Sequence, residues 1–202
     1  SDIGRGGVTY STFDYAEFMR NRPPLYEPAI DEATMWARME TFLKVVIPVA
    51  EKAGVRMALH PDDPPVPEPL GGVAQICSTM EQFRRIFAAV PSSNHAMLFC
   101  QGCMTELLGQ GVYDAIAEMA AANQIAWVHF RNVRGHLPRF AEVFLDEGDI
   151  DMRRAMTTYR DNGFNGPYMM DHTPHFPHTH SEWLGKAYAI GYIRSLLQTV
   201  YG

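Results

Sequence analysis

Short apolar runs alternate with longer segments of helical character, and this alternation restricts the fold more than any other feature of the sequence. The four strongest runs cover residues 55–60, 95–100, 125–130 and 167–171. Strands that alternate with helices of ten or more residues predict βαβ units and a parallel sheet. The runs are apolar almost throughout, which is expected when helices cover both faces of a sheet.

The predicted helices follow from apolar periodicity and from their end signals. Asp31 is placed to cap the first helix, Gly54 to end it, and Pro48 to kink it or cause a local irregularity. The helices are predicted at about 33–52, 78–90 and 111–123, from about Asp151, and at about 182–200. Before them come a β-prone segment at 8–13 and a proline-rich piece containing Pro23, Pro24 and Pro28.

The length of 202 residues favours one well-buried domain. Within it we distinguish a loop-rich segment with one helix, residues 1–53, and four βα units, residues 54–202. Four units do not close an eight-stranded (β/α)8 barrel, which typically takes about 250 residues. The chain is therefore either a smaller open α/β sheet or the C-terminal portion of a barrel, and its loop-like start favours the second interpretation.

Composition excludes several classes of function. A net charge of -6 argues against a general nucleic-acid binder, because no basic stripe is available to neutralise phosphates. We see neither an apolar run near the ~20 residues that span a bilayer nor the apolar core of a signal peptide. Three cysteines cannot all pair, so a cytoplasmic location is the simplest expectation.

Each of the four apolar runs ends in a residue that can bind a metal. These residues are His60, Cys100, His129 and Asp171, and they follow one another at intervals of 40, 29 and 42 residues. Because a (β/α) barrel gathers its chemistry at the carboxyl ends of its strands, the set predicts a shared metal site. Singly, each has another explanation, such as a buried free cysteine at Cys100 or a core histidine at His129.

Neighbouring residues are candidates for further roles. Arg131 has the same side-chain direction as His129 if the strand continues, so it suits a substrate carboxylate or an ordinary salt bridge. His172 follows Asp171 and can act as acid or base near neutral pH. A redox pair of Cys100 and Cys103 is less favoured, because we expect Cys103 on a loop and the motif after a strand instead of capping a helix.

Five motifs together resemble the D-mannonate dehydratase family. They are His60-Pro-Asp-Asp-Pro-Pro, Phe99-Cys-Gln-Gly102, His129-Phe-Arg-Asn-Val133, the acidic segment from Phe144 to Met152, and Met170-Asp-His172, and they occur in the family's order. The resemblance runs from about residue 1 to residue 202. It implies a xylose-isomerase-like TIM barrel of which only about the C-terminal half is present in this chain.

The resemblance also implies chemistry. The family's reaction is the loss of water from D-mannonate to give 2-keto-3-deoxy-D-gluconate, and the enzyme class is a carbon–oxygen lyase. A divalent metal, preferentially Mn²⁺ with Fe²⁺ or Co²⁺ as alternatives, would be held by the four residues named above. His172 and Arg131 would be catalytic, and Arg131, Asn132 and Asp62 would bind the small sugar-acid substrate.

One family feature is missing. Better-known members have a tyrosine downstream of the Asp-His pair, and residues 174–180 contain none. Tyr188 lies further on, within the predicted last helix. One of His175, His178 and His180 can substitute for the family's tyrosine. The alternative is that these three are surface histidines or adventitious metal binders.

Two alternative functions remain open at the level of sequence. One is a sugar isomerase or epimerase on the same barrel, against which the Cys100 ligand argues. The other is a catalytically incomplete, metal-binding half-barrel. A half-barrel has exposed sheet edges, so we expect homo-oligomers or association with the missing N-terminal half, and no nucleic-acid or membrane partner.

Overall fold

A four-stranded parallel sheet forms the centre of the structure, a computed structural model that describes residues 1–22, 25 and 27–202. Its strands are β4 (Met57–Leu59), β5 (His95–Cys100), β6 (Ile125–His129) and β9 (Tyr168–Met169), hydrogen-bonded in that order. The α/β class, the parallel sheet and its four strands are confirmed. The outer strands are shorter than the apolar runs at 55–60 and 167–171 predict.

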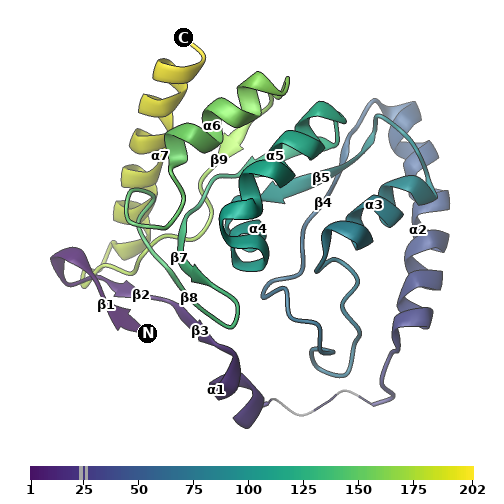
Figure 1. Cartoon of the computed structure of the whole chain (residues 1–202), viewed down its shortest axis with the longest axis horizontal. Coiled ribbons are helices and arrows are strands. Elements are labelled where there is room, and N and C mark those ends of the chain that lie inside the picture. The colour runs from purple at the N-terminus through teal and green to yellow at the C-terminus, as the bar shows by residue number, and fades with distance from the viewer. Residues whose placement is uncertain (23–24, 26) are drawn as a thin grey trace.

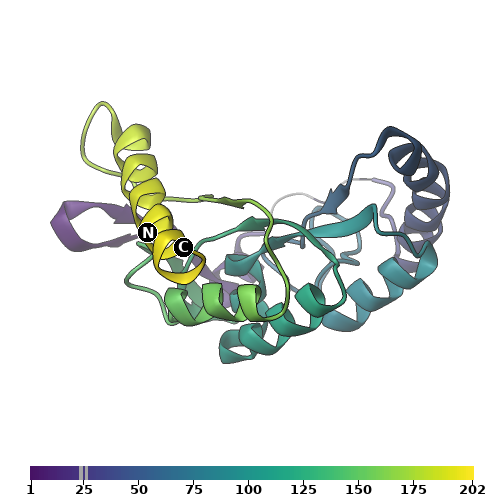
Figure 2. The ribbon, with the colours of Figure 1, turned by 90° about the horizontal axis from the view of Figure 1, so that it is seen from above.

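Six helices accompany the sheet. They are α2 (Glu32–Ala53), α3 (Met80–Ala89), α4 (Gln101–Leu108), α5 (Val112–Ala121), α6 (Met152–Asp161) and α7 (Ser181–Val200). Seen from above, α4, α5 and α6 lie along one face of the sheet, while α2 and α7 stand at its two ends (Figures 1 and 2). α5 and α6 bury mainly apolar side chains; in α6 these are Met152, Ala155, Met156 and Tyr159.

Local end signals explain where the helices begin and end. The carboxylates of Asp31 and Asp151 accept hydrogen bonds from the backbone N–H groups of Thr34 and Arg154, three residues on. Gly54 ends α2 with φ 64, in the left-handed region that favours glycine. α2 nevertheless continues through Pro48, which lies on its exposed side, so the proline does not end this helix.

Two features differ from the sequence prediction. Residues 101–108 form α4, where the sequence predicts a loop. The long loop predicted after β6 contains a hairpin of β7 (Val133–His136) and β8 (Arg139–Glu142). The helix α4 and the strands of the β7–β8 hairpin are short and carry polar or charged side chains. They therefore lack the apolar pattern from which the other helices and strands are predicted.

The N-terminal segment adds strands to this hairpin. It contains β1 (Asp2–Ile3), a 3-10 turn at Arg5–Gly7, β2 (Thr9–Tyr10), β3 (Thr12–Asp14) and α1 (Tyr15–Arg20). β1 pairs with β2, and β3 pairs antiparallel with β8, so the β-prone segment at 8–13 is confirmed. Phe13 stacks on Phe140 across this pair with ring centroids 5.3 Å apart. Pro23 and Pro24 of the proline-rich piece lie outside the described residues.

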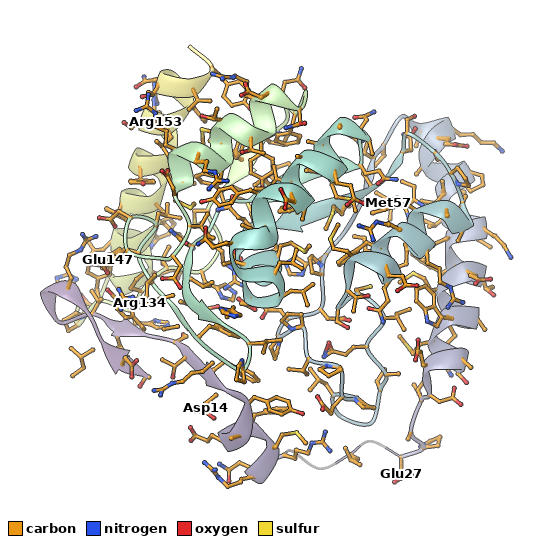
Figure 3. All side chains as sticks on the ribbon, viewed as in Figure 1. Asp14, Glu27, Met57, Arg134, Glu147 and Arg153 are labelled. Atoms are coloured by element: carbon orange, nitrogen blue, oxygen red, sulfur yellow. The ribbon has the colours of Figure 1, made fainter. Side chains whose placement is uncertain are left out.

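The main hydrophobic core lies between the sheet and its helices. A smaller cluster of Val8, Tyr10, Val143 and Phe144 attaches the N-terminal segment to the chain that follows β8. Side chains fill the space between these elements (Figure 3). Beside the smaller cluster, Nη2 of Arg134 donates a hydrogen bond to the carbonyl oxygen of Glu147. In the part of the chain that the structure describes, we find no helix with the length and apolarity that a membrane span requires.

Candidate metal centre

Three of the four predicted ligands meet at the carboxyl end of the sheet. His60 directly follows β4, Cys100 ends β5 and His129 ends β6. The sheet register pairs Cys100 with His129, and one potential ligand atom from each of the three residues lies within 4.8 Å of the others. The rings of His60 and His129 are 5.5 Å apart between centroids.

Asp171, two residues after β9, completes the group. Its Oδ2 is 3.5 Å from Nδ1 of His129 and 3.9 Å from Sγ of Cys100. The parallel register places the ends of β5, β6 and β9 at the same level, which is why residues so distant in sequence converge. The structure thus brings together all four strand-end residues.

Arg131 lies buried against this group, with 1% of its surface exposed. Its Nε is 3.4 Å from Sγ of Cys100 and 3.3 Å from Oδ2 of Asp171. Close approach of Arg131 requires a glycine at position 102, because a Cβ there would lie 2.2 Å from Nε. The buried guanidinium therefore supports the site through its contacts with Cys100 and Asp171.

Three further carboxylates surround the same guanidinium. Its Nη1 donates to Glu142 at 2.6 Å, and its Nη2 lies 2.8 Å from Asp63 and 3.0 Å from Glu106. One guanidinium thus contacts four carboxyl groups and two cysteine sulfurs, those of Cys100 and Cys103. Asp63, Cys103 and Glu106 also cluster within 4.8 Å, but this second cluster already holds the guanidinium as its counter-charge.

The surroundings favour a thiolate at Cys100. Burial opposes ionisation, but the Cys103 thiol, the Arg131 guanidinium and the two histidines outweigh it and hold the pKa of Cys100 well below its usual value. Cys103 is the hydrogen-bonding partner of Cys100, and this contact raises the pKa of the Cys103 thiol well above its usual value. The nearby carboxylate of Asp171, followed by the sulfur of Cys100, raises the pKa of His129 to about 9.

Glu106 balances the excess of negative charge by staying protonated. Burial, against the attraction of Arg131, raises its pKa to about 9. The short contact to Arg131 would favour the charged form, but both carboxyl oxygens are buried without a hydrogen-bond partner among the described residues, and the cost of burying a charge prevails.

Cys103 lies differently from the sequence prediction. It belongs to α4 instead of a loop, and Cys100 occupies the residue immediately before the helix. The Cys-x-x-Cys motif therefore both follows a strand and starts a helix, and the prediction that it does not cap a helix is wrong. All three cysteines are free thiols.

The predicted substrate-binding side chains are engaged within the protein. Asp62 accepts from the backbone N–H of Cys77 at 2.7 Å, which fixes the loop after β4. The Asn132 amide donates to the carbonyl oxygens of Leu145 and Ile150, each at 2.9 Å. Their assignment to substrate stays a prediction, as does that of the buried Arg131.

His172 is half-exposed and lies beside the metal-ligand candidates. Its Nδ1 is hydrogen-bonded to Oε1 of Glu142, and its Nε2 is 3.9 Å from Oδ2 of Asp171. The hydrogen bond to Glu142, against burial, raises the pKa of His172. Sequence reasoning missed Glu142, because it ends a short polar strand in a region predicted as loop.

The other candidates for the second acid or base have contacts of their own. The backbone of His175 forms an isolated antiparallel bridge with the backbone of Thr9. The rings of His178 and His180 lie against each other at 5.5 Å, both on an exposed turn. The Tyr188 hydroxyl donates to Asp146 at the smaller hydrophobic cluster.

Fold and site define the class of protein: an α/β protein whose parallel strands gather two histidines, a cysteine and an aspartate at their carboxyl ends. The chain belongs to the D-mannonate dehydratase (UxuA) family, whose model matches residues 14–201.

Curated relatives agree with this assignment. A mannonate dehydratase of Lactococcus lactis subsp. lactis is 33% identical over 149 residues, which cover 71% of this chain and 41% of the relative. Mannonate dehydratase 2 of Halalkalibacterium halodurans is 31% identical over 146 residues, covering 71% of this chain and 42% of the relative. The chain thus spans about two fifths of the length of these relatives.

Solved structures are similar as well. The crystal structure of mannonate dehydratase from Streptococcus suis serotype 2 superimposes with a TM-score of 0.71 and 27% identity, over 86% of this chain and 52% of that one. A xylose isomerase domain protein from Alicyclobacillus acidocaldarius gives a TM-score of 0.55 at 14% identity over 76% of this chain and 54% of that one, which is a similarity of fold.

Proposed function

We propose that this chain carries the metal centre of a hydro-lyase that converts D-mannonate into 2-keto-3-deoxy-D-gluconate. The observation that carries the proposal is the convergence of His60, Cys100, His129 and Asp171 in a member of the D-mannonate dehydratase family. The sugar acid is the substrate named by the relatives, and its carboxylate and hydroxyl oxygens suit a divalent cation.

The residues present fit such a cation. Nδ1 of His129 is buried without a hydrogen-bond partner among the described residues, although it faces the carboxylate of Asp171. The thiolate of Cys100 and the carboxylate of Asp171 add negative charge beside it, and Arg131 alone does not compensate the carboxylates around it. Imidazole, thiolate and carboxylate ligands suit a first-row divalent metal. Mn²⁺ is our first choice, with Fe²⁺ or Co²⁺ as alternatives.

The protein's own side chains divide the work. A bound divalent ion supplies Lewis acidity that acidifies the proton beside the substrate carboxylate and stabilises the negative charge that develops. His172 is accessible, and its Nε2 lies on the side of Asp171, where it can transfer a proton to or from a bound sugar acid. The buried Arg131 holds Cys100 and Asp171 in place, which is a positioning role instead of direct substrate contact.

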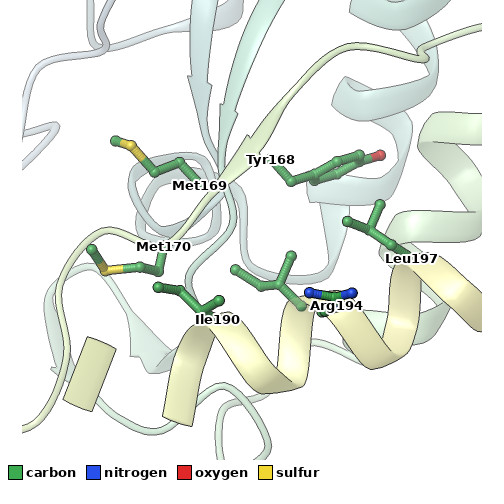
Figure 4. A pocket seen from close by; sticks show the side chains of 7 residues that line it. Tyr168, Met169, Met170, Ile190, Arg194 and Leu197 are labelled. Atoms are coloured by element: carbon green, nitrogen blue, oxygen red, sulfur yellow. The ribbon is translucent and has the colours of Figure 1, made fainter. Parts of the chain in front are cut away.

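We further propose that residues 1–202 are one domain, the C-terminal portion of a (β/α)8 barrel. Both outer strands border apolar grooves. The groove at β9 is lined by Tyr168, Met169, Met170, Ile190, Ile193, Arg194 and Leu197 (Figure 4). The groove at β4 is lined by residues of α2, β4 and β5, among them Phe42, Val46 and Met57. In a complete barrel the remaining strands would cover these grooves, and a second copy of the chain is the alternative partner.

The test combines metal content with turnover. The chain is purified under reducing conditions, which suit its three free thiols and the cytoplasmic location we propose, and is then loaded with Mn²⁺. Wild type is expected to hold about one Mn²⁺ per chain by elemental analysis, and Cys100→Ser to lose most of it. Cys77→Ser is the matched control, because Cys77 is a buried free thiol that is absent from the ligand group.

Turnover is followed as keto-deoxy acid formed from D-mannonate. Product formation by the Mn²⁺-loaded wild type, and its loss in Cys100→Ser, supports the proposal. Equal and negligible metal content in wild type and Cys100→Ser would contradict the shared site. Metal binding without any keto-deoxy acid would contradict dehydration by this chain alone.

A further inference from the structure

Glu142 stands between the buried arginine and the accessible histidine of the site. It is the last residue of β8, and its Oε1 accepts from Nη1 of Arg131 at 2.6 Å. The same oxygen is hydrogen-bonded to Nδ1 of His172. Glu142 is therefore the link in a chain of contacts from Arg131 to His172.

This contact fixes which ring nitrogen of His172 faces the metal-ligand candidates. An ionised carboxylate can only accept, so Nδ1 of His172 must carry the hydrogen whether the ring is neutral or charged. Nε2 is then the nitrogen that lies toward Asp171, at 3.9 Å from its Oδ2. A neutral histidine has two tautomers, and the hydrogen bond of one nitrogen determines the state of the other.

The position of Glu142 is itself held by residues distant in sequence. Its backbone N–H donates to the carbonyl oxygen of Ser11 at 2.9 Å, and the neighbouring Ala141 pairs with Thr12. Phe140 stacks on Phe13 within the same pair of strands. β7 pairs along the other side of β8, so the strand that carries Glu142 is hydrogen-bonded on both edges.

We propose that Glu142 is a positioning residue that sets the ring orientation and tautomer of His172 and couples it through Arg131 to Cys100 and Asp171. The assignment of His172 to proton transfer rests on the proposed function; the orientation of its ring by Glu142 does not. Orienting partners of this kind change activity by about 10–100-fold when removed.

The first experiment observes the histidine ring nitrogens directly. Long-range ¹H–¹⁵N correlation spectra are recorded on the ¹⁵N-labelled full chain without added metal, at a pH where His172 is neutral. His172→Gln identifies the His172 signals. Wild type is expected to show the tautomer with hydrogen on Nδ1, and Glu142→Ala a shift toward hydrogen on Nε2, because the acceptor is gone.

Two variants separate positioning from structural support. Glu142→Gln keeps an amide oxygen that accepts from Nδ1, so it should retain the wild-type tautomer although it loses the charge beside Arg131. Glu118→Gln is the matched control, because Glu118 also pairs with an arginine, Arg84, but does so on the exposed surface of α5. If Glu142→Ala does not fold, Glu142→Leu removes the acceptor at similar volume. Wild-type ring signals in a folded variant without an acceptor would overturn the proposal.

Turnover gives an independent second result. With D-mannonate and Mn²⁺, Glu142→Ala is expected to lower kcat by about 10–100-fold at nearly unchanged KM, with partial rescue in Glu142→Gln. Absence of turnover in wild type, together with the expected tautomer change, would contradict the dehydratase proposal and support the role of Glu142. Unchanged kcat in Glu142→Ala, with turnover in wild type, would contradict the coupling.

Discussion

At the scale of single residues, the site is organised around one guanidinium. Arg131 contacts Asp63, Glu106, Glu142 and Asp171 and also approaches the thiol of Cys100. Removing one partner of such a network leaves uncompensated buried charge, which commonly costs about 3–5 kcal/mol. Arg131 therefore holds two of the ligand candidates, Cys100 and Asp171, together with their acidic surroundings, and the protonated Glu106 limits the excess of negative charge.

Glu106 leads to a pH-dependent prediction. Because its pKa is about 9 in the folded protein and near 4.5 when unfolded, the unfolded chain loses the proton first. The contribution of Glu106 to the free energy of unfolding is fully retained below about pH 4.5. It is lost as the pH rises, by at most about 1.4 kcal/mol per pH unit, and the loss levels off near pH 9.

Glu106→Gln should remove this dependence. We expect the unfolding free energy of Glu106→Gln to increase steadily relative to that of wild type as the pH rises from 5 to 8. Urea denaturation across this pH range measures the difference. Glu81→Gln, a change at an exposed position of α3, is the control. A difference for Glu106→Gln that is independent of pH would contradict a protonated Glu106.

The sequence predicts the four ligand candidates better than their surroundings. His60, Cys100, His129 and Asp171 are recognisable because each ends an apolar run, and parallel register then brings the ends together. The carboxylates around Arg131 carry no comparable signal. Glu106 and Glu142 come from α4 and β8, and only the tertiary fold places them at one guanidinium.

At the scale of elements, helix ends depend on particular side chains. α6 begins after Asp151, whose Oδ1 accepts from the backbone N–H of Arg154 at 2.9 Å. Asp151→Ala should lower the unfolding free energy by about 1 kcal/mol, because this N–H loses its partner. Urea denaturation measures the change. Asp161→Ala, at the exposed other end of α6, should change stability by less than about 0.5 kcal/mol, and equal effects of both changes would contradict the capping role.

The elements that sequence reasoning missed have a physical reason in common. α4 contains Gly102, a poor helix former that is needed there so that Arg131 can approach. β7 and β8 expose polar side chains, and the pairing of β8 with β3 is formed by residues far apart in sequence. The central strands and longer helices were predictable because burial of apolar side chains dominates them. The remaining elements depend on contacts between distant segments.

At the scale of the whole molecule, the sheet ends in two strands that border apolar grooves. Ile190 and Met169 at the β9 groove are 56% and 39% exposed (Figure 4). Open sheet edges and exposed apolar surface favour association. We expect this chain alone to self-associate at micromolar concentration, and Ile190→Lys to increase the fraction of monomer in sedimentation velocity experiments.

A control tests whether the groove is responsible. Ile3→Lys removes an apolar side chain that is 84% exposed on β1, outside the grooves at β4 and β9. It should leave the sedimentation profile unchanged. A wild-type chain that remains monomeric, or equal effects of the two substitutions, would contradict association through the β9 groove.

The pairing of β3 with β8 also has a consequence for the order in which the protein forms during synthesis. Phe13 and Phe140 are partners although 127 residues separate them. At translation rates of about 5–20 residues per second, β3 waits roughly 6–25 s before its partner strand has been made. The bridge from Thr9 to His175 must wait longer still. The parallel strands can pair as they emerge from the ribosome, whereas the strand that carries Glu142 gains its last neighbour only by pairing with a segment that was made well before it.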